Sequence, residues 1–412
     1  MWLICSNIFE LKNLFNYIDT PNRTSYNIFV QSFWTNNGEL IMAVLNVKFD
    51  NILCFNNFEA NFTYPKKLVR TTLENEFLCN YPNFRYRKLN IIVGSNATGK
   101  TSLGKVILNV FVFLFKKESK TLLELVSNTN KEAYILMDCV FPEGVFFRVE
   151  IKILINGEIL VKYQEVSLYP DDSYETVLNR LNKDEKEYHN YLLELENVSI
   201  SGWNFKFPTI ESGFDIISCN YEKEERKEFA KVLYSVLKTF DCSIKNVTPS
   251  KEVENSYIVS FENNKKTIAI TDGDKLSEIK VLSSGSKYAI NIADSIYAIK
   301  KHKNGFYFID EQFSYVNPDL EIACLTTMVN LLDDGEQLFF TSHDTEILAL
   351  PFPNHSFNFM RKATNDNGEV NIEMINAAAL EKRNNVNIKN LFDNDYFDVA
   401  VNTDLITDLG EK

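Results

Sequence analysis

A glycine-bounded loop carries residue types that can hold a chain of phosphates. It follows the apolar run 89–93 and reads Gly-Ser-Asn-Ala-Thr-Gly-Lys-Thr. Gly94 and Gly99 permit backbone conformations that other residues resist, so successive N–H groups can converge on phosphate oxygens at the start of a helix. Lys100 is then placed to reach the β- and γ-phosphates, and the Thr101 hydroxyl to bind Mg²⁺. The candidate nucleotide-binding residues are Gly94, Ser95, Asn96, Ala97, Thr98, Gly99, Lys100, Thr101 and Ser102.

Two later apolar runs also end in polar side chains. Residues 306–309 lead into Asp310 and Glu311, and residues 338–340 lead through Thr-Ser to His343. Asp310 suits Mg²⁺, a hard cation that takes carboxylate oxygens beside substrate phosphates. Glu311 can orient or deprotonate an attacking water, and His343 can donate to a γ-phosphate. A solvated acid pair and a structural histidine are the simpler alternatives, and the structural interpretation is preferred for the other three histidines.

Strands alternating with helices would position these groups. Helically spaced apolar residues follow the loop from Leu103 to Leu114, a second helix is expected after residue 281, and a third at Pro318. Polar residues at the carboxyl ends of buried strands are typical of a parallel sheet whose ligand lies above those ends. We therefore predict an α/β fold.

Two further lobes are predicted beside this core. Alternating residues between Val44 and Val93 and in the meander 134–168, with a hairpin at Asn156-Gly157, indicate an antiparallel β-lobe. Charged helices at 173–196 and 222–237, followed by a hairpin at 257–270, indicate a helical lobe. The expected segments are an N-terminal extension of undecided role (1–41), the first part of the core with the β-lobe (42–170), the helical lobe and hairpin (171–280), the second part of the core (281–375) and a C-terminal tail (376–412).

Composition limits the class of protein. The net charge of −13 over 412 residues gives no support to a general phosphate-binding surface, although it does not exclude DNA. No apolar run is long enough to span a bilayer, so we expect a soluble protein that does not bind a membrane. The seven cysteines show no metal-binding spacing, and most lie in apolar runs, as buried thiols do. Their odd number and the lack of a cleavable leader indicate the cytoplasm.

Taken in order, these motifs resemble the heads of ABC-type ATPases, in the branch that contains SMC, RecF and OLD proteins. Residues 282–286, Leu-Ser-Ser-Gly-Ser, resemble the L-S-G-G-Q signature but depart from it at the third and fifth positions. Asp310-Glu311 match the Walker B pair, Asn317 the end of the neighbouring D-loop, and His343 the switch histidine. The resemblance covers residues 42–375 and implies a mixed sheet with the two lobes, ATP and Mg²⁺ as ligands, and ATP hydrolysis.

The resemblance also implies roles for residues outside the loop and the acid pair. Gln164 falls in the region where such ATPases place a glutamine that senses Mg²⁺ and the γ-phosphate, although an exposed strand residue is the simpler interpretation. Ser283 and Gly285 would contact the nucleotide of another subunit, so the chain would pair head to tail as a homodimer or higher oligomer. An ordinary Ser-Gly helix cap is the alternative at that position.

The expected purpose follows from analogy within the branch. Without sustained heptads for a coiled coil, the chain looks like compact OLD-like ATPases that bacteria encode beside a separate effector in anti-phage systems such as Septu, PARIS and abortive-infection loci. This implies a nucleotide-dependent sensor or switch whose nuclease or toxin partner is a separate protein. A DNA repair or recombination ATPase that clamps DNA, with nucleic acid as its partner, is the alternative, and an ATP-driven motor for an unidentified membrane partner is a third.

Overall fold

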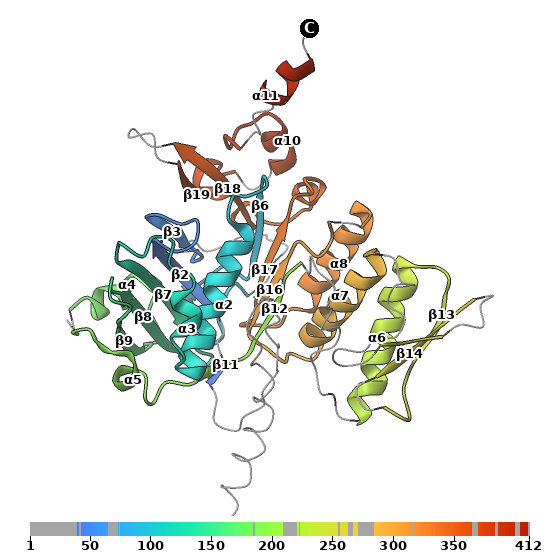
Figure 1. The fold of residues 1–412 in the computed structure, drawn as a ribbon, viewed down its shortest axis with the longest axis horizontal. Coiled ribbons are helices and arrows are strands. Elements are labelled where there is room, and N and C mark those ends of the chain that lie inside the picture. The colour runs from blue at the N-terminus through green and yellow to red at the C-terminus, as the bar shows by residue number, and fades with distance from the viewer. Residues whose placement is uncertain are drawn as a thin grey trace, which may run out of the picture.

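A computed structural model describes most of the chain, and two six-stranded sheets organise the described part (Figure 1). The described residues are 39–40, 43–64, 73, 75–183, 186–208, 221, 223–253, 256–262, 267–270, 284–314, 316–364, 370–383, 386–399 and 404–410. The fold is α/β, with a mixed central sheet, an antiparallel lobe and a group of helices, as predicted. Apart from residues 39 and 40, the predicted N-terminal extension lies outside the described residues.

The central sheet is parallel except at one edge. Its strands, in spatial order, are β12 (Trp203–Lys206), β16 (Phe306–Asp310), β17 (Gln337–Ser342), β6 (Leu89–Gly94), β18 (Phe357–Thr364) and β19 (Val370–Asn376), of which β19 alone runs antiparallel to its neighbour. In this register Thr341 lies opposite both Asp310 and Ile92. The carboxyl ends of β6, β16 and β17 therefore meet at one edge of the sheet, as the strand pattern predicted.

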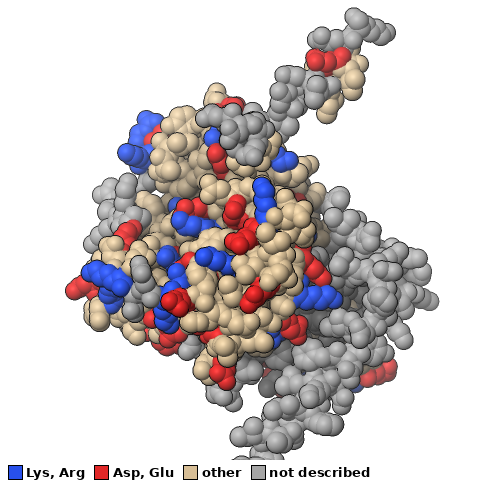
Figure 2. Space-filling model, turned by 60° about the vertical axis from the view of Figure 1, so that its left-hand side comes forward, with Lys and Arg blue, Asp and Glu red and all other residues tan. Residues whose placement is uncertain are grey.

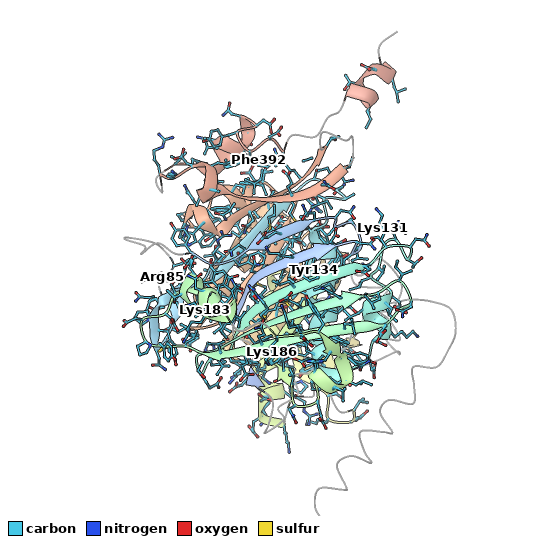
Figure 3. The ribbon with its side chains drawn as sticks, turned by 90° about the vertical axis from the view of Figure 1, so that its left-hand side faces the viewer. Arg85, Lys131, Tyr134, Lys183, Lys186 and Phe392 are labelled. Carbon is cyan, nitrogen blue, oxygen red and sulfur yellow. The ribbon has the colours of Figure 1, made fainter. Side chains whose placement is uncertain are left out.

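The second sheet is the predicted β-lobe and is antiparallel throughout. It contains β10 (His189–Asn190), β9 (Ile159–Ser167), β8 (Val145–Ile153), β7 (Ala133–Val140), β2 (Ala43–Asp50) and β3 (Phe58–Asn61), in that order. The hairpin at Asn156-Gly157 is confirmed, since Gly157 has φ +82° and the Leu154 N–H donates to the Glu158 carbonyl. Figure 3 shows the meander from outside, with Tyr134 on β7.

Helix α2 (Lys100–Lys116) lies between the two sheets (Figure 1). Its apolar residues share one hydrophobic cluster with residues of both sheets, among them Phe147 of β8 and Phe306 of β16. Burial on both sides explains why residues 106–114 are almost all apolar instead of following one stripe. At Gly104 the packing is so close that an added Cβ would lie 2.5 Å from the Phe308 ring. The helix that carries Lys100 is thus fixed against the strand that carries Asp310.

Helices lie on the opposite face of the central sheet in two layers. They are α7 (Ser284–Lys300) and α8 (Pro318–Leu331) and, packed against α7, α6 (Lys223–Phe240), and a small sheet of β13 (Ile244–Pro249), β14 (Tyr257–Phe261) and β15 (Thr267–Ile270) packs with them in one hydrophobic cluster (Figure 1). The helices expected at 222–237, after 281 and at Pro318 are therefore confirmed. The antiparallel β14–β15 hairpin is confirmed as well, whereas its Asn263-Asn264 turn lies outside the described residues.

The single helix predicted for residues 173–196 is wrong. The structure has α4 (Tyr174–Leu181), then β10, then α5 (Tyr191–Glu194). Asn190 begins a new helix, because its side chain accepts a hydrogen bond from the Leu192 N–H, and β10 pairs with β9. Further along the range expected to be a helical lobe, residues 203–206 form β12 and extend the central sheet. Tertiary pairing thus overrides a helical pattern that was local and weakly apolar.

Shorter elements complete the described chain. They are β1 (Glu39–Leu40), β4 (Phe77–Leu78), β5 (Tyr81–Arg85), α3 (Lys120–Leu123), β11 (Ile200–Ser201), η2 (Glu346–Ala349), η3 (Asn354–Ser356), α9 (Ala377–Leu380), α10 (Ile388–Asp393), α11 (Asp404–Thr407) and η4 (Asp408–Gly410). None of the described helices has the length and apolar character needed to cross a bilayer.

Most of the described cysteines are not buried. Of the five described cysteines, all free, Cys139 is buried, Cys324 is partly buried, and Cys54, Cys79 and Cys242 are exposed, so the expectation that most are buried is wrong.

Figure 2 shows the β-lobe side of the molecule, where basic and acidic side chains alternate over the described surface. The described part of that face therefore carries no broad basic area of the kind a phosphate backbone needs.

Candidate functional site

The phosphate loop connects β6 to α2 through two positions with left-handed backbone. Ala97 has φ +61° and Gly99 has φ +95°. Gly94 is required for a different reason: a Cβ there would lie 2.5 Å from the Met360 carbonyl oxygen of the neighbouring strand β18. The Thr98 hydroxyl closes the loop by donating to the Ser95 carbonyl at 2.8 Å. The glycines singled out in the sequence are thus needed by the backbone.

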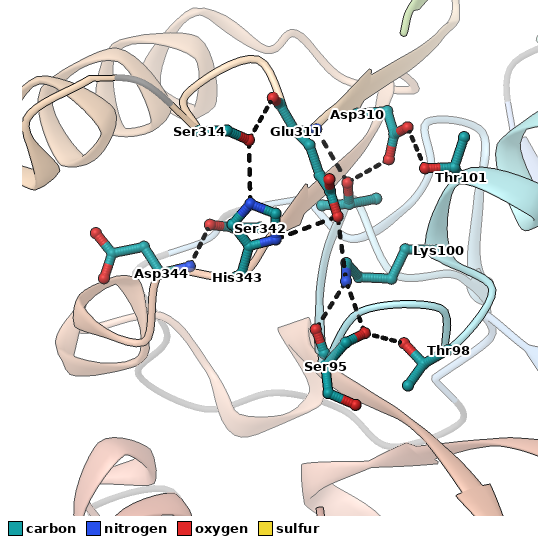
Figure 4. Close-up of polar contacts among 12 residues, drawn as sticks. Ser95, Thr98, Lys100, Thr101, Asp310, Glu311, Ser314, Ser342, His343 and Asp344 are labelled. Atoms are coloured by element: carbon teal, nitrogen blue, oxygen red, sulfur yellow. Dashed lines mark hydrogen bonds and ion pairs between the residues drawn. The ribbon is translucent and has the colours of Figure 1, made fainter. Parts of the chain in front are cut away.

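The interior of this loop suits an anion. Gly99 caps α2 and has no side chain, so the capping residue leaves the N–H groups of the first turn unoccupied. Lys100 is 4% exposed, and its ammonium group donates to the carbonyls of Gly94 at 2.7 Å and Ser95 at 3.2 Å. Figure 4 shows this ammonium between the loop and Glu311, whose carboxylate oxygen lies 3.2 Å away. A cation and a helix N-terminus therefore act at the same place.

Asp310 ends β16 in full burial, beside two hydroxyl groups (Figure 4). One carboxylate oxygen accepts a hydrogen bond from Thr101 at 2.7 Å, and the other from Thr341 at 2.5 Å. Burial raises the pKa of Asp310 to about 6, and these two hydrogen bonds limit the rise. A buried carboxylate next to a hydroxyl offers the hard oxygen donors that Mg²⁺ takes, so the residues fit this ion.

Glu311 has an unusual backbone conformation. Its φ is +45°, in the left-handed region, and its N–H donates to the hydroxyl of Thr341 at 3.1 Å and to the Thr341 carbonyl at 3.3 Å. The side chain points at both Lys100 and His343. Although burial raises the pKa of Glu311, the His343 hydrogen bond and the Lys100 charge outweigh it, and the pKa lies below its usual value. Glu311 is therefore a carboxylate at neutral pH.

His343 is held on both sides of its ring. Nδ1 lies 3.3 Å from the Glu311 carboxylate, and Nε2 lies 3.0 Å from the Ser314 hydroxyl. Because that hydroxyl donates to the Glu311 carbonyl, it can accept from Nε2, so both ring nitrogens can act as donors. The bond to Glu311 raises the pKa of His343 above its ordinary value despite partial burial. The arrangement favours the imidazolium form.

A pocket opens beside this ring. It is lined by Glu311, Phe313, Ser314, Val316, Glu321, Ser342, His343 and Asp344. Glu321, in the first turn of α8, is almost fully buried, and burial raises its pKa to about 7. Asn317, the residue that matches the end of the D-loop, caps α8 by accepting from the Asp319 N–H. Helix α8 and the turn after β16 bring Glu321 and Ser314 to the site, and strand register brings Thr341; motif matching alone missed these three residues.

Five residues predicted from the sequence thus converge: Lys100, Thr101, Asp310, Glu311 and His343. Ser102 lies in the first turn of α2, and Asn96 and Ala97 are exposed at the loop tip. The structure places Gln164 elsewhere, on β9 of the β-lobe, where its amide donates to the Leu181 carbonyl at 3.5 Å. Gln164 is buried, so its interpretation as an exposed strand residue is wrong. Ser283 lies outside the described residues, and Gly285 is partly buried in the first turn of α7.

The remaining histidines lie apart from these residues. His355 is fully buried 2.6 Å from Glu76, and His302 lies 3.3 Å from Glu336. His189 is exposed on β10. Their partners explain His355 and His302 as structural residues.

No family model matches the chain, and no curated protein matches it. Solved structures with a similar fold include the SMC head bound to the C-winged helix domain of ScpA, with 11% identity, a TM-score of 0.48 and coverage of 82% of this chain and 99% of that chain. A second similar structure is an SMC head with an extended coiled coil bound to the C-terminal domain of ScpA, derived from Pyrococcus furiosus. It has 12% identity and a TM-score of 0.43, with coverage of 81% of this chain and 96% of that chain.

The recombination mediator protein RecF gives 12% identity, a TM-score of 0.39 and coverage of 81% of this chain and 99% of that chain. These structures come from the protein groups that the motifs resemble. At such scores the likeness assigns neither a family nor an activity to this chain.

The pairing of His343 with Glu311 predicts a measurable titration. The pKa of His343 should lie above the ordinary value of about 6.5, because the neighbouring carboxylate favours the imidazolium. In Glu311→Gln the pKa of His343 should fall. In the unsubstituted protein, the pair contributes stability that is fully present below pH about 6.5 and is lost as the pH rises through the raised pKa of His343. NMR of the four histidines, with His343→Gln for assignment, measures this; an unchanged titration in Glu311→Gln would contradict it.

Proposed function

We propose that this chain binds ATP with Mg²⁺ and hydrolyses it to ADP and phosphate, as an ABC-type ATPase head. The observation that supports this best is the meeting of Lys100, the acid pair and His343 at the carboxyl ends of three neighbouring strands. The phosphate loop precedes the acid pair and His343 by more than two hundred residues, and each group has the chemistry that its motif requires. The local resemblance of the four motifs supports the same assignment.

Each residue then has a defined task. Thr101 and Asp310 would hold Mg²⁺, which neutralises phosphate charge when bound. The loop N–H groups and Lys100 bind the β- and γ-phosphates. Glu311 accepts a proton from water as the water oxygen bonds to the γ-phosphorus and the bond from that phosphorus to the bridging oxygen breaks, which releases ADP. His343, as an imidazolium, donates a hydrogen bond to the γ-phosphate.

The contact between Lys100 and Glu311 suggests how ATP prepares the base. At 3.2 Å the two groups neutralise each other, and His343 binds the same carboxylate oxygen. An arriving γ-phosphate offers both cations a more highly charged partner. Glu311 is then released to hold the attacking water. Without nucleotide, the base is therefore kept out of use by the two groups that recognise the substrate.

Substitutions at Lys100 and Glu311 should have separable effects. Lys100→Ala should abolish ATP binding, because the buried ammonium is the main cation of the loop. Glu311→Gln should keep ATP binding but lower kcat by about 10²- to 10⁴-fold, since the amide cannot accept the proton. Binding of a fluorescent ATP analogue and phosphate release measure the two effects. Lys131→Ala, an exposed lysine of the β-lobe labelled in Figure 3, is the control. Equal loss of binding in both site variants would contradict the assigned roles.

We also propose that hydrolysis takes place in a head-to-tail homodimer. The chain carries one phosphate loop and one signature-like segment, residues 282–286. In the resembled family Ser283 and Gly285 would face the nucleotide of the other subunit, and a two-fold axis would then make two composite sites. Larger assemblies built from such dimers are compatible with this arrangement. The position of Gly285 at the start of a helix, partly exposed, is what a contact of this kind needs.

A composite site predicts that turnover depends on protein concentration. Specific activity should rise with concentration and reach a plateau as dimers form. Ser283→Arg should leave ATP binding by the monomer intact and stop turnover, because the larger side chain blocks the second wall of the site. Ser235→Arg, on the exposed surface of α6, is the matched control. Normal turnover in Ser283→Arg, or specific activity independent of concentration, would remove the composite-site argument.

For the biological role, we propose a nucleotide-dependent switch in cytoplasmic anti-phage defence that controls a separate effector, a nuclease or toxin. Support comes from the resemblance of the motifs to compact OLD-like ATPases. In two of the compared structures an SMC head is bound to a domain of another protein, ScpA. The compared RecF is a recombination mediator protein, and a DNA clamp is accordingly the second candidate. The role of Gln164 as a γ-phosphate sensor stays a prediction.

One experiment separates these roles. The chain is expressed with the genes that flank it, purified as Glu311→Gln with ATP, and its mass is measured. A stable complex with a neighbouring gene product, lost in Lys100→Ala, supports the switch. Binding of duplex DNA that needs ATP and weakens steeply with salt supports the clamp instead. If neither a partner nor DNA binds in the ATP state, the proposed switch fails.

A further inference from the structure

We propose that the Thr341 hydroxyl is the positioning group that fixes Asp310 and Glu311 relative to each other, an inference that rests on the proposed ATPase function. Thr341 lies near the end of β17, directly opposite Asp310 in the parallel register. It belongs to neither the acid pair nor the phosphate loop. Its place between the strand of the acids and the strand of the loop makes it the link between them.

A single hydroxyl contacts both acids. Thr341 donates its proton to one oxygen of Asp310 at 2.5 Å and accepts from the N–H of Glu311 at 3.1 Å. A hydroxyl has one proton and two lone pairs, so both bonds can exist at once. Thr341 is only 1% exposed, and water does not compete for these contacts. The two acids are thereby held by the same atom.

The composition of β17 indicates that this hydroxyl has a specific use. The preceding residues Leu338, Phe339 and Phe340 are fully buried and apolar. Valine has the shape of threonine and would pack in the same place without a polar atom. Burying a hydroxyl costs free energy unless it is hydrogen-bonded, and here its described partners are the two acids. The packing of the strand therefore gives no reason for a threonine, whereas the acids do.

The bond to Glu311 supports a strained backbone. Glu311 has φ +45°, a backbone conformation that L-residues adopt only at a cost in free energy. Its N–H is held by Thr341 through both the hydroxyl and the carbonyl oxygen. If the hydroxyl is removed, one of the two bonds that offset the strain is lost. The peptide can then relax, and the carboxylate moves away from Lys100 and His343, where it is needed as the base.

The bond to Asp310 decides which oxygen faces the loop. Thr341 takes one carboxylate oxygen, and the other is left for Thr101 at 2.7 Å. The second oxygen is therefore the one available to a Mg²⁺ ion held with Thr101. Without Thr341 the carboxylate is free to rotate about its last bond. The affinity for Mg²⁺ should fall for this reason, in addition to the loss in the chemical step.

The test compares Thr341→Val with Thr341→Ser in the full-length protein. Groups that orient metal ligands typically contribute 10- to 100-fold. Thr341→Val should lower kcat by about that factor and raise the Mg²⁺ concentration that gives half activity, while the KM for ATP at saturating Mg²⁺ changes little. Thr341→Ser keeps the hydroxyl and should restore both. Thr63→Val, which removes the hydroxyl of a buried threonine in the β-lobe bonded to Asn61, should leave activity unchanged.

The outcomes separate this inference from the proposed function. If the unsubstituted protein does not hydrolyse ATP, the proposed function fails. If it does, and Thr341→Val keeps its kcat and Mg²⁺ dependence, the positioning role is overturned. Equal impairment in Thr341→Ser would show that the methyl group matters instead, and would overturn it too. Should the valine variant not fold, the pair Thr341→Ser and Thr341→Ala differs by the hydroxyl alone and decides the question in the same way.

Discussion

The parallel register of β16, β17 and β6 is the constraint on which the candidate site depends. Because the three strands end at one edge, the acids, the Thr341 hydroxyl and the phosphate loop must share a small volume. The apolar residues of these strands are buried on both faces, so a shift in register would move polar groups into the interior. Packing of the core therefore keeps the groups of the site together.

The charges gathered at this edge need one another. Lys100 and Asp310 are almost or fully buried, and a buried charge costs free energy unless it is paired and hydrogen-bonded. The Lys100 ammonium donates hydrogen bonds to two loop carbonyls and pairs with Glu311, and the Asp310 carboxylate accepts hydrogen bonds from two hydroxyls. His343 completes the set by pairing with Glu311. In the proposed function, a triphosphate with its metal ion replaces the contact between Lys100 and Glu311. The charges that stabilise the site without nucleotide are then the same charges that bind ATP.

The two lobes have different relations to this site. The β-lobe packs against α2, the helix that starts at Lys100, and so supports the loop from behind. The helices α7 and α8 lie on the other face, and α8, which Asn317 caps, places Glu321 in the pocket beside His343. A change at the start of either helix is therefore close to His343 or to the signature-like segment. In the proposed homodimer, this is where the second subunit would act on turnover.

The sequence by itself determined the loop, the acid pair, the histidine and the alternation of strands and helices, because each rests on local spacing of glycines, polar residues and apolar runs. It also predicted the β7–β9 meander and α6, whose patterns are strong. The tertiary structure alone decided that residues 203–206 join the central sheet and that the helical pattern of 173–196 is broken by β10. It also decided that Gln164 is buried and bonded to Leu181, and that Thr341 lies between the acids. These outcomes depend on pairing and packing between separate segments of the chain, for which local spacing contains no information.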